Sequence, residues 1–106
     1  MAGSALGAGV VAASVVLMLG LAATGSAAVE SQRMAGVADA AALAAADTAS
    51  GAVGGDPCVR AAQVAGAQRA SLVSCELDGL VATVTVSATF AGMPVVATAR
   101  AGPPPG

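Results

Sequence analysis

The first 29 residues of the chain, MAGSALGAGVVAASVVLMLGLAATGSAAV, carry no charged side chain. A helix needs about 20 apolar residues to span the hydrocarbon core of a bilayer. The stretch 5–28 is long enough, so residues 1–29 are predicted to be a transmembrane segment. The alternative is a secretory signal peptide, because Ser26, Ala27 and Ala28 are small residues suited to a cleavage site. The retained helix is favoured because no Lys or Arg precedes the apolar stretch, which also exceeds the usual ~7–15 residues of a signal core.

The next segment, residues 30–50, continues with no proline and with one glycine, Gly36. Alanine dominates it and is the strongest helix former, so the apolar helix is predicted to continue unbroken to about Ser50. A helix of residues 5–50 would be roughly 70 Å long, of which the bilayer core takes only about 30 Å. Residues 30–50 are therefore predicted to form an extended stalk helix beyond the membrane.

The stalk carries a polar stripe and a stripe of small residues. Asp39 and Asp47 lie within about 80° of each other around a helix. Gly36, Ala40 and Ala44 recur at four-residue spacing, which permits close helix approach. Two interpretations fit this spacing equally: a stalk that packs against neighbouring stalks, and an amphipathic helix that lies on its own domain.

Residues 51–101 are predicted to form a small α+β head. Gly51, Gly54 and Gly55 end the long helix. Asp56 as N-cap and Pro57 at the first helical position then begin a second helix that extends to about Ala70. The apolar face expected for this helix consists of Cys58, Ala62, Val64 and Ala65, whereas Arg60 and Arg69 are expected in solvent.

The segment SLVSCELDGLVATVTVSATF is predicted to form a β-hairpin. Asp78-Gly79 is a two-residue signal for a type I′ turn, which places Leu77 opposite Leu80 and Cys75 opposite Ala82. The inward face of this hairpin is then Val73, Cys75, Leu77, Leu80, Ala82, Val84 and Val86. Residues 95–101 suit a third strand, and residues 102–106 form a Pro/Gly tail. The fold class is α+β: a long N-terminal helix, a short second helix and a small antiparallel sheet of two or three strands.

The chain has two cysteines, Cys58 and Cys75, both in the head. Cys75 lies on the inward face of the hairpin, where the helix that carries Cys58 would pack. A disulfide between them would contribute about 3 kcal/mol, and the alternative is two free buried thiols. A disulfide implies an oxidising compartment. The expected topology is therefore single-pass in the cell membrane, with a cytoplasmic N-terminus and an extracytoplasmic head.

The composition argues against several classes of function. The chain has no histidine, and its two cysteines are too far apart for a CxxC motif, so no catalytic, metal-binding or cofactor-binding residues are predicted. Glu76 and Asp78 are interpreted as solvated charges at a turn. A net charge of −2 with a single aromatic residue argues against nucleic acid. An enzyme, a cofactor and a small-molecule substrate are not expected.

An apolar helix that continues as a stalk into a small disulfide-linked head is similar to a pilin. In particular, GVADAAALAAADTASGAVGGDPCVRAAQVAGAQRASLVSCELDGLVATVTV resembles the actinobacterial TadE-like proteins of the helicase/secretion neighbourhood. The matching features are the DAAALAAA segment, the GGDPC helix start and the cysteine-containing hairpin with its Asp-Gly turn. The chain departs from the family in having no arginine before the apolar segment and no Glu before Glu30, so cleavage by a prepilin peptidase is not expected.

The resemblance implies a minor pilin or pseudopilin-like subunit of a Tad (tight adherence) type IV pilus or a related secretion system. Cys58 and Cys75 correspond to the head cysteines of that family, and Asp39 and Leu43 to its stalk motif. The implied partners are the membrane, other pilin-like subunits, the platform membrane proteins and, indirectly, the secretion ATPase. The candidate assembly residues are then Gly36, Asp39, Ala40, Leu43, Ala44 and Asp47. The alternatives are a small secreted α+β binding protein without residues 1–28, and a single-pass envelope protein with no pilus role.

Overall fold

The computed structural model describes residues 2–104, without the side chains of residue 2 and residues 22–24. Helix α1 (Ala2–Ala49) is followed by α2 (Pro57–Ala67) and by strands β1 (Ser71–Asp78), β2 (Val81–Phe90) and β3 (Met93–Ala101). The strands form one antiparallel sheet in the order β1-β2-β3. The predicted α+β architecture and the unbroken long helix are confirmed.

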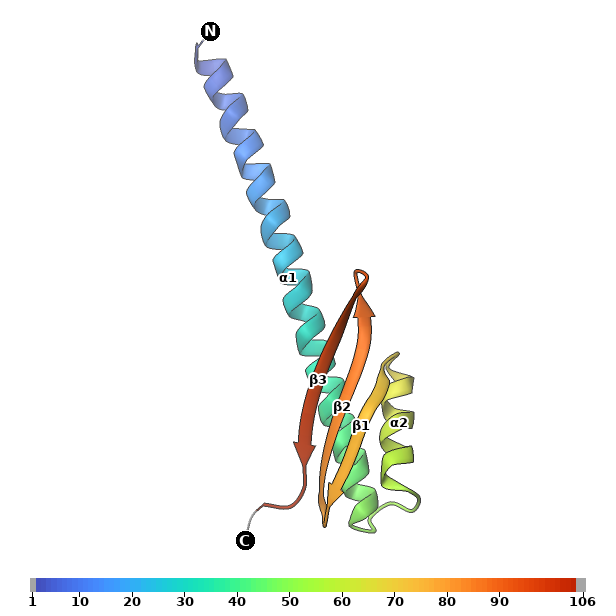
Figure 1. Ribbon diagram of the computed structural model, residues 1–106. Helices are drawn as coiled ribbons and strands as arrows, with labels where there is room; N and C mark the ends of the chain where they lie inside the picture. The colour runs from blue at the N-terminus through green and yellow to red at the C-terminus, as the bar shows by residue number, and fades with distance from the viewer. Residues whose placement is uncertain (1, 105–106) are drawn as a thin grey trace.

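The molecule is elongated because α1 extends far beyond the head (Figure 1). Its longest dimension is 76 Å and its radius of gyration is 21.3 Å, whereas a compact chain of this length would have a radius of gyration of about 13 Å. Helix α1 ends where Gly51 adopts a left-handed φ of 84° and donates its N–H to the Thr48 carbonyl. Glycine adopts this conformation without a steric penalty.

The core lies between the C-terminal half of α1, α2 and one face of the sheet. Its α1 members are Met34, Val37, Ala38, Ala41, Ala42, Ala45 and Ala46. The alanines let the helix approach the sheet closely, and Val84 and Val86 of β2 are buried against this layer. Of the two interpretations of residues 30–50, the structure therefore has the helix lying on its own domain.

Helix α2 begins as predicted, because the Asp56 carboxylate accepts hydrogen bonds from the N–H groups of Cys58 at 2.9 Å and Val59 at 3.1 Å. It ends at Ala67 rather than near Ala70. Arg69 adopts a left-handed φ of 60°, and Ala70 donates its N–H to the Ala65 carbonyl, which is the hydrogen bond of a Schellman C-cap.

The predicted apolar face of α2 is partly wrong. Ala65 is buried, and Val64 and Cys58 are half-buried, as expected. Ala62 is exposed, however, and Ala61 is buried in its place. The core lies in two directions from this helix, toward α1 and toward β1, so a single narrow stripe does not describe the buried side.

The predicted hairpin register is wrong by two residues. Asp78 pairs with Val81 and Cys75 with Val84, so the loop residues are Gly79 and Leu80. Only Gly79 has a positive φ, 61°, which corresponds to a type II′ turn rather than type I′. Because the shift is an even number of residues, Ala82, Val84 and Val86 still face the core.

Near the start of β1, the register with β2 shifts between Leu72 and Ser74, and this shift changes which residue faces inward. Leu72 pairs with Val86 and packs on the core, whereas Val73 is 60% exposed. Such a bulge shifts side chains to the other face of a strand. The inward placement predicted for Val73 is therefore wrong, and Leu77 and Leu80 are 41% and 47% exposed at the end of the sheet.

The third strand begins at Met93 rather than at residue 95 and includes Pro94. Pro94 is accommodated because β3 is an edge strand. The β2–β3 loop consists of Ala91 and Gly92, with φ values of 51° and 78°, as in a type I′ turn.

Candidate assembly and membrane surface

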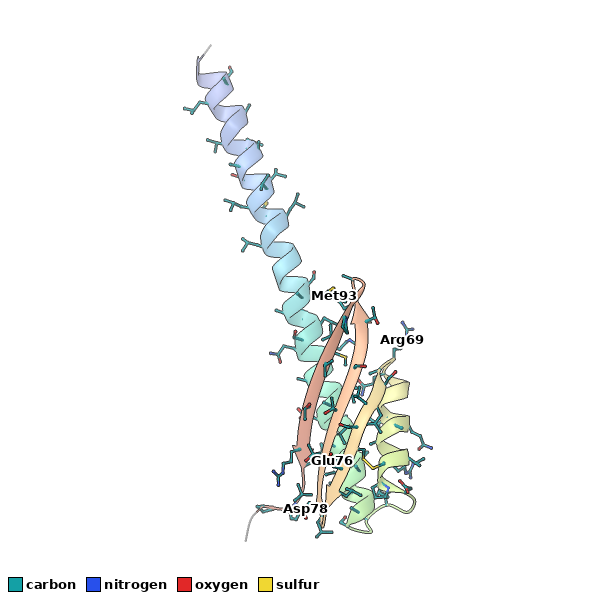
Figure 2. All side chains as sticks on the ribbon, in the orientation of Figure 1. Arg69, Glu76, Asp78 and Met93 are labelled. Atoms are coloured by element: carbon teal, nitrogen blue, oxygen red, sulfur yellow. A yellow bond between two sulfur atoms is a disulfide. The ribbon has the colours of Figure 1, made fainter. Side chains whose placement is uncertain are left out.

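The N-terminal half of α1 is an apolar rod in which every described side chain of residues 3–29 is exposed (Figure 2). Its large apolar side chains are between 50% and 73% exposed: Leu6, Val10, Val11, Val15, Val16, Leu17, Met18, Leu19, Leu21 and Val29. By length and composition, α1 is the one helix among residues 2–104 that could cross a membrane. A contiguous apolar surface of this kind is rare on soluble monomers and marks a membrane or protein contact.

The six candidate assembly residues share one face of α1, opposite the core. A helix turns by about 100° per residue, so the positions from Gly36 to Asp47 that are not buried lie on one side of it. Gly36, Asp39, Leu43 and Asp47 are exposed, and Ala40 and Ala44 are half-buried. The structure therefore brings these residues together on an outward surface, which we call the outer face of α1.

Two shallow grooves flank the outer face of α1. Toward α2, the groove is lined by Ala44, Asp47, Arg60 and Val64, among others. Toward β3, a hollow is lined by Asp39, Leu43 and Arg100, among others. Leu43, which lines that hollow, is 56% exposed. The outer face thus combines an exposed leucine, small residues and two carboxylates.

An ion pair lies where α1 leaves the head. The Arg33 guanidinium donates to both carboxylate oxygens of Glu30, at 2.8 and 3.1 Å, and to the Gln68 carbonyl at 3.0 Å. Because Gln68 is the C-cap of α2, Arg33 also faces the negative end of that helix. The hydrogen bond from Arg33 lowers the pKa of Glu30, against a smaller opposing effect of burial, and the same bond raises the pKa of Arg33.

The disulfide between Cys58 and Cys75 is present and links α2 to β1. The two Cα atoms are 5.8 Å apart, within the usual range for this bond. Cys58 lies in the first turn of α2 and Cys75 is half-buried in the middle of β1. The disulfide thus links the second helix covalently to the sheet.

Comparisons of the chain with protein-family models, with curated proteins and with solved structures find no match. The arguments for function therefore depend on the residues and the geometry of this chain.

Two features of the surface were not predicted from the sequence. The contact of Arg33 with Gln68 joins residues 35 positions apart, and no local pattern indicates it. The second feature is the exposed β2–β3 turn with Met93, which adjoins the half-buried Phe90. Its signal was present, since Phe90 is the single aromatic residue of the chain and stands next to the turn.

Proposed function

We propose that the protein is a membrane-anchored minor pilin or pseudopilin-like structural subunit of a Tad type IV pilus or a related secretion system. Its N-terminus would be cytoplasmic and its head extracytoplasmic, and its partners would be other pilin-like subunits and the assembly machinery. The observation that carries the proposal is the continuity of α1, whose exposed apolar half passes without a linker into the core of a disulfide-linked head.

This continuity has a mechanical consequence. The first half of α1 needs lipid or other apolar helices around it, because each large apolar side chain transferred out of water contributes about 1.5–3 kcal/mol. The second half is fixed to the sheet and α2 by its buried inner face. A force on the apolar half is therefore transmitted to the head through one rigid helix, as a subunit held by its N-terminal helix requires.

Intact mass in separated cell fractions tests the anchoring. The expected species is full-length, found in the membrane fraction, and alkylated at Cys58 and Cys75 only after reduction. A soluble species that begins at Val29 would contradict the proposal. That outcome would instead support a secreted binding protein, an alternative that the structure favours in one respect: the first buried side chain described in α1 is Met34, so the core does not need residues 1–28.

A second experiment tests assembly through the outer face of α1. Gly36→Leu and Ala40→Leu are expected to reduce incorporation into filaments, or co-purification with the platform proteins, and to leave the melting temperature nearly unchanged. The region around Gly36 is open, since no heavy atom other than those of its chain neighbours and of the adjacent α1 backbone lies within 4 Å of the position that a Cβ would occupy. Ala62→Leu on the exposed side of α2 is the matched control. Full assembly of both α1 variants would show that this face is not an interface.

A further inference from the structure

The head has two distinct ends along the direction of α1. The proximal end adjoins the apolar half of α1 and contains the β2–β3 turn from Phe90 to Met93. The distal end contains the β1–β2 turn from Asp78 to Val81. Figure 2 shows Met93 and Arg69 at the proximal end, and Glu76 and Asp78 toward the distal end.

Very little chain separates the apolar half of α1 from the head. Val29 is the last residue of the uncharged segment, and Met34 is fully buried in the core. Five residues of helix correspond to about 7.5 Å. A helix cannot bend sharply without a proline, a bulge or a similar defect, and α1 continues through this stretch without interruption. A bilayer around the apolar half therefore lies within one or two helical turns of the core.

The β2–β3 turn extends closer to that bilayer than the core does. At the distal end, Leu80 lines the same hollow as Asp47 and Ser50. From there the ten residues of β2 run toward the proximal end. The strand is about 30 Å long, the length of about 20 residues of helix. The turn is thus near the level of residues 27–30 of α1, where the uncharged segment ends. Figure 1 shows the β2–β3 turn alongside the middle of α1.

The chemistry of the turn suits the interface of a membrane. No charged side chain occurs between Val81 and Ala99. Phe90 is the single aromatic residue of the chain and is half-buried, and Met93 is 67% exposed. Aromatic and large apolar side chains on one exposed edge are what interfacial segments insert below the headgroups.

The charges of the head are unevenly distributed between its ends. At the proximal end, Glu30 is paired with Arg33 and Arg69 is exposed, for a net charge of +1. The remaining groups, from Asp39 onward, are five acids (Asp39, Asp47, Asp56, Glu76 and Asp78) and two arginines (Arg60 and Arg100), for a net charge of −3. The two values add to the −2 of the whole chain. The end that faces the bilayer is therefore the cationic one, and anionic headgroups attract it.

We propose that the proximal end of the head rests on the bilayer that α1 spans. In this docked state the turn Phe90–Met93 enters the headgroup region, and Arg69 binds the phosphate oxygens of anionic lipids. The inference depends on the membrane anchoring proposed above and describes the subunit in the membrane, before any assembly. The docking holds the head close to the bilayer and opposes tilting of α1.

Single tryptophans in the full-length protein test the docking directly, because the chain contains no Trp or Tyr. Met93→Trp is reconstituted in phosphatidylcholine/phosphatidylglycerol vesicles, with lipids brominated either near the headgroup or deep in the chains. The expected result is blue-shifted emission that headgroup-proximal bromine quenches strongly. Leu80→Trp, in the loop at the distal end and 47% exposed, is the matched control and is expected to emit as in water.

A third reporter, Leu17→Trp, separates the two proposals. It lies in the apolar half of α1 and is expected to be quenched by deep bromine. Quenching of Leu17→Trp without quenching of Met93→Trp would overturn the docking and leave the anchoring intact. Absence of quenching at both positions would overturn the anchoring and the docking together.

The role of Arg69 is tested by charge reversal in the Met93→Trp background. One arginine near an anionic surface favours the bound state about fivefold, so Arg69→Glu is expected to remove the additional quenching that phosphatidylglycerol gives over phosphatidylcholine. Arg100→Glu makes the same charge change away from the proximal end. This variant is expected to retain the additional quenching by phosphatidylglycerol vesicles. Equal effects of both variants, or no effect of Arg69→Glu, would refute a specific contact between Arg69 and anionic headgroups.

Discussion

At the scale of single residues, Met34 marks the point where α1 changes from a free rod to part of the core. It is among the largest fully buried side chains in the described part of the chain. Met34→Ala is expected to lower the free energy of unfolding by about 2–5 kcal/mol, because it removes buried methylenes and leaves a cavity. Urea unfolding in detergent measures this change. Met93→Ala, at a side chain 67% exposed, is expected to change the stability by only about 0.5 kcal/mol, and equal losses would contradict the assigned core.

Glu30 is the residue whose ionisation is most clearly coupled to the fold. Its pKa lies below the ordinary value of 4.5 because Arg33 donates hydrogen bonds to the carboxylate. A lowered pKa in the folded state means that the pair stabilises the head above pH 4.5, and that this contribution is lost as the pH falls through the folded-state pKa. Titration of the carboxyl carbon by NMR should show the lowered pKa. Arg33→Gln should return it toward 4.5, and an unchanged pKa in that variant would assign the shift to another cause.

At the scale of elements, the β2–β3 turn stores a small strain. Ala91 has a φ of 51°, a conformation that costs a residue with a Cβ about 1–2 kcal/mol. Ala91→Gly is therefore expected to raise the free energy of unfolding. Ala62→Gly, in the exposed middle of α2, should instead lower it by about 0.5–1 kcal/mol. Thermal melts of the two variants check this opposite sign, and destabilisation by Ala91→Gly would be evidence against the type I′ turn.

The disulfide between Cys58 and Cys75 is the covalent link between α2 and β1. Helix α2 buries only Ala61 and Ala65, so its apolar contact is small. Reduction of the bond, or Cys58→Ser with Cys75→Ser, is expected to cost about 3 kcal/mol. Melting curves with and without reductant, with the double serine variant as a control for reagent effects, measure this difference. Identical curves would show that the disulfide contributes nothing to stability.

At the scale of the whole molecule, the head is expected to fold without the apolar rod. The described core begins at Met34, so a chain that begins at Val29 should unfold cooperatively, with a melting temperature within a few degrees of the full-length protein. A chain that begins at Ala38 lacks Met34 and Val37 and should lose cooperative unfolding, as circular dichroism can measure. If the longer chain also failed to fold, the apolar half of α1 would contribute to the head in a way that its exposed side chains do not indicate.

The amino-acid sequence by itself determined the elements. The lack of proline before Pro57 and the abundance of alanine predicted one helix into the stalk, and Asp56-Pro57 predicted the start of α2. The inward positions of Ala82, Val84 and Val86 followed from the alternation of side chains along a strand. These predictions succeeded because propensity, capping and strand periodicity act between residues close in the chain.

Only the tertiary structure decided the register of β1 with β2, the bulge that turns Val73 outward, and the use of Ala61 rather than Ala62 in the core. It also decided which half of α1 is covered, and it placed Arg33 on Gln68 and the β2–β3 turn beside the apolar rod. The physical reason is that each of these is set by packing between elements far apart in sequence. In a chain this rich in alanine and valine, side chains of similar size give several registers nearly equal local energy, so the closest fit of the whole core selects one.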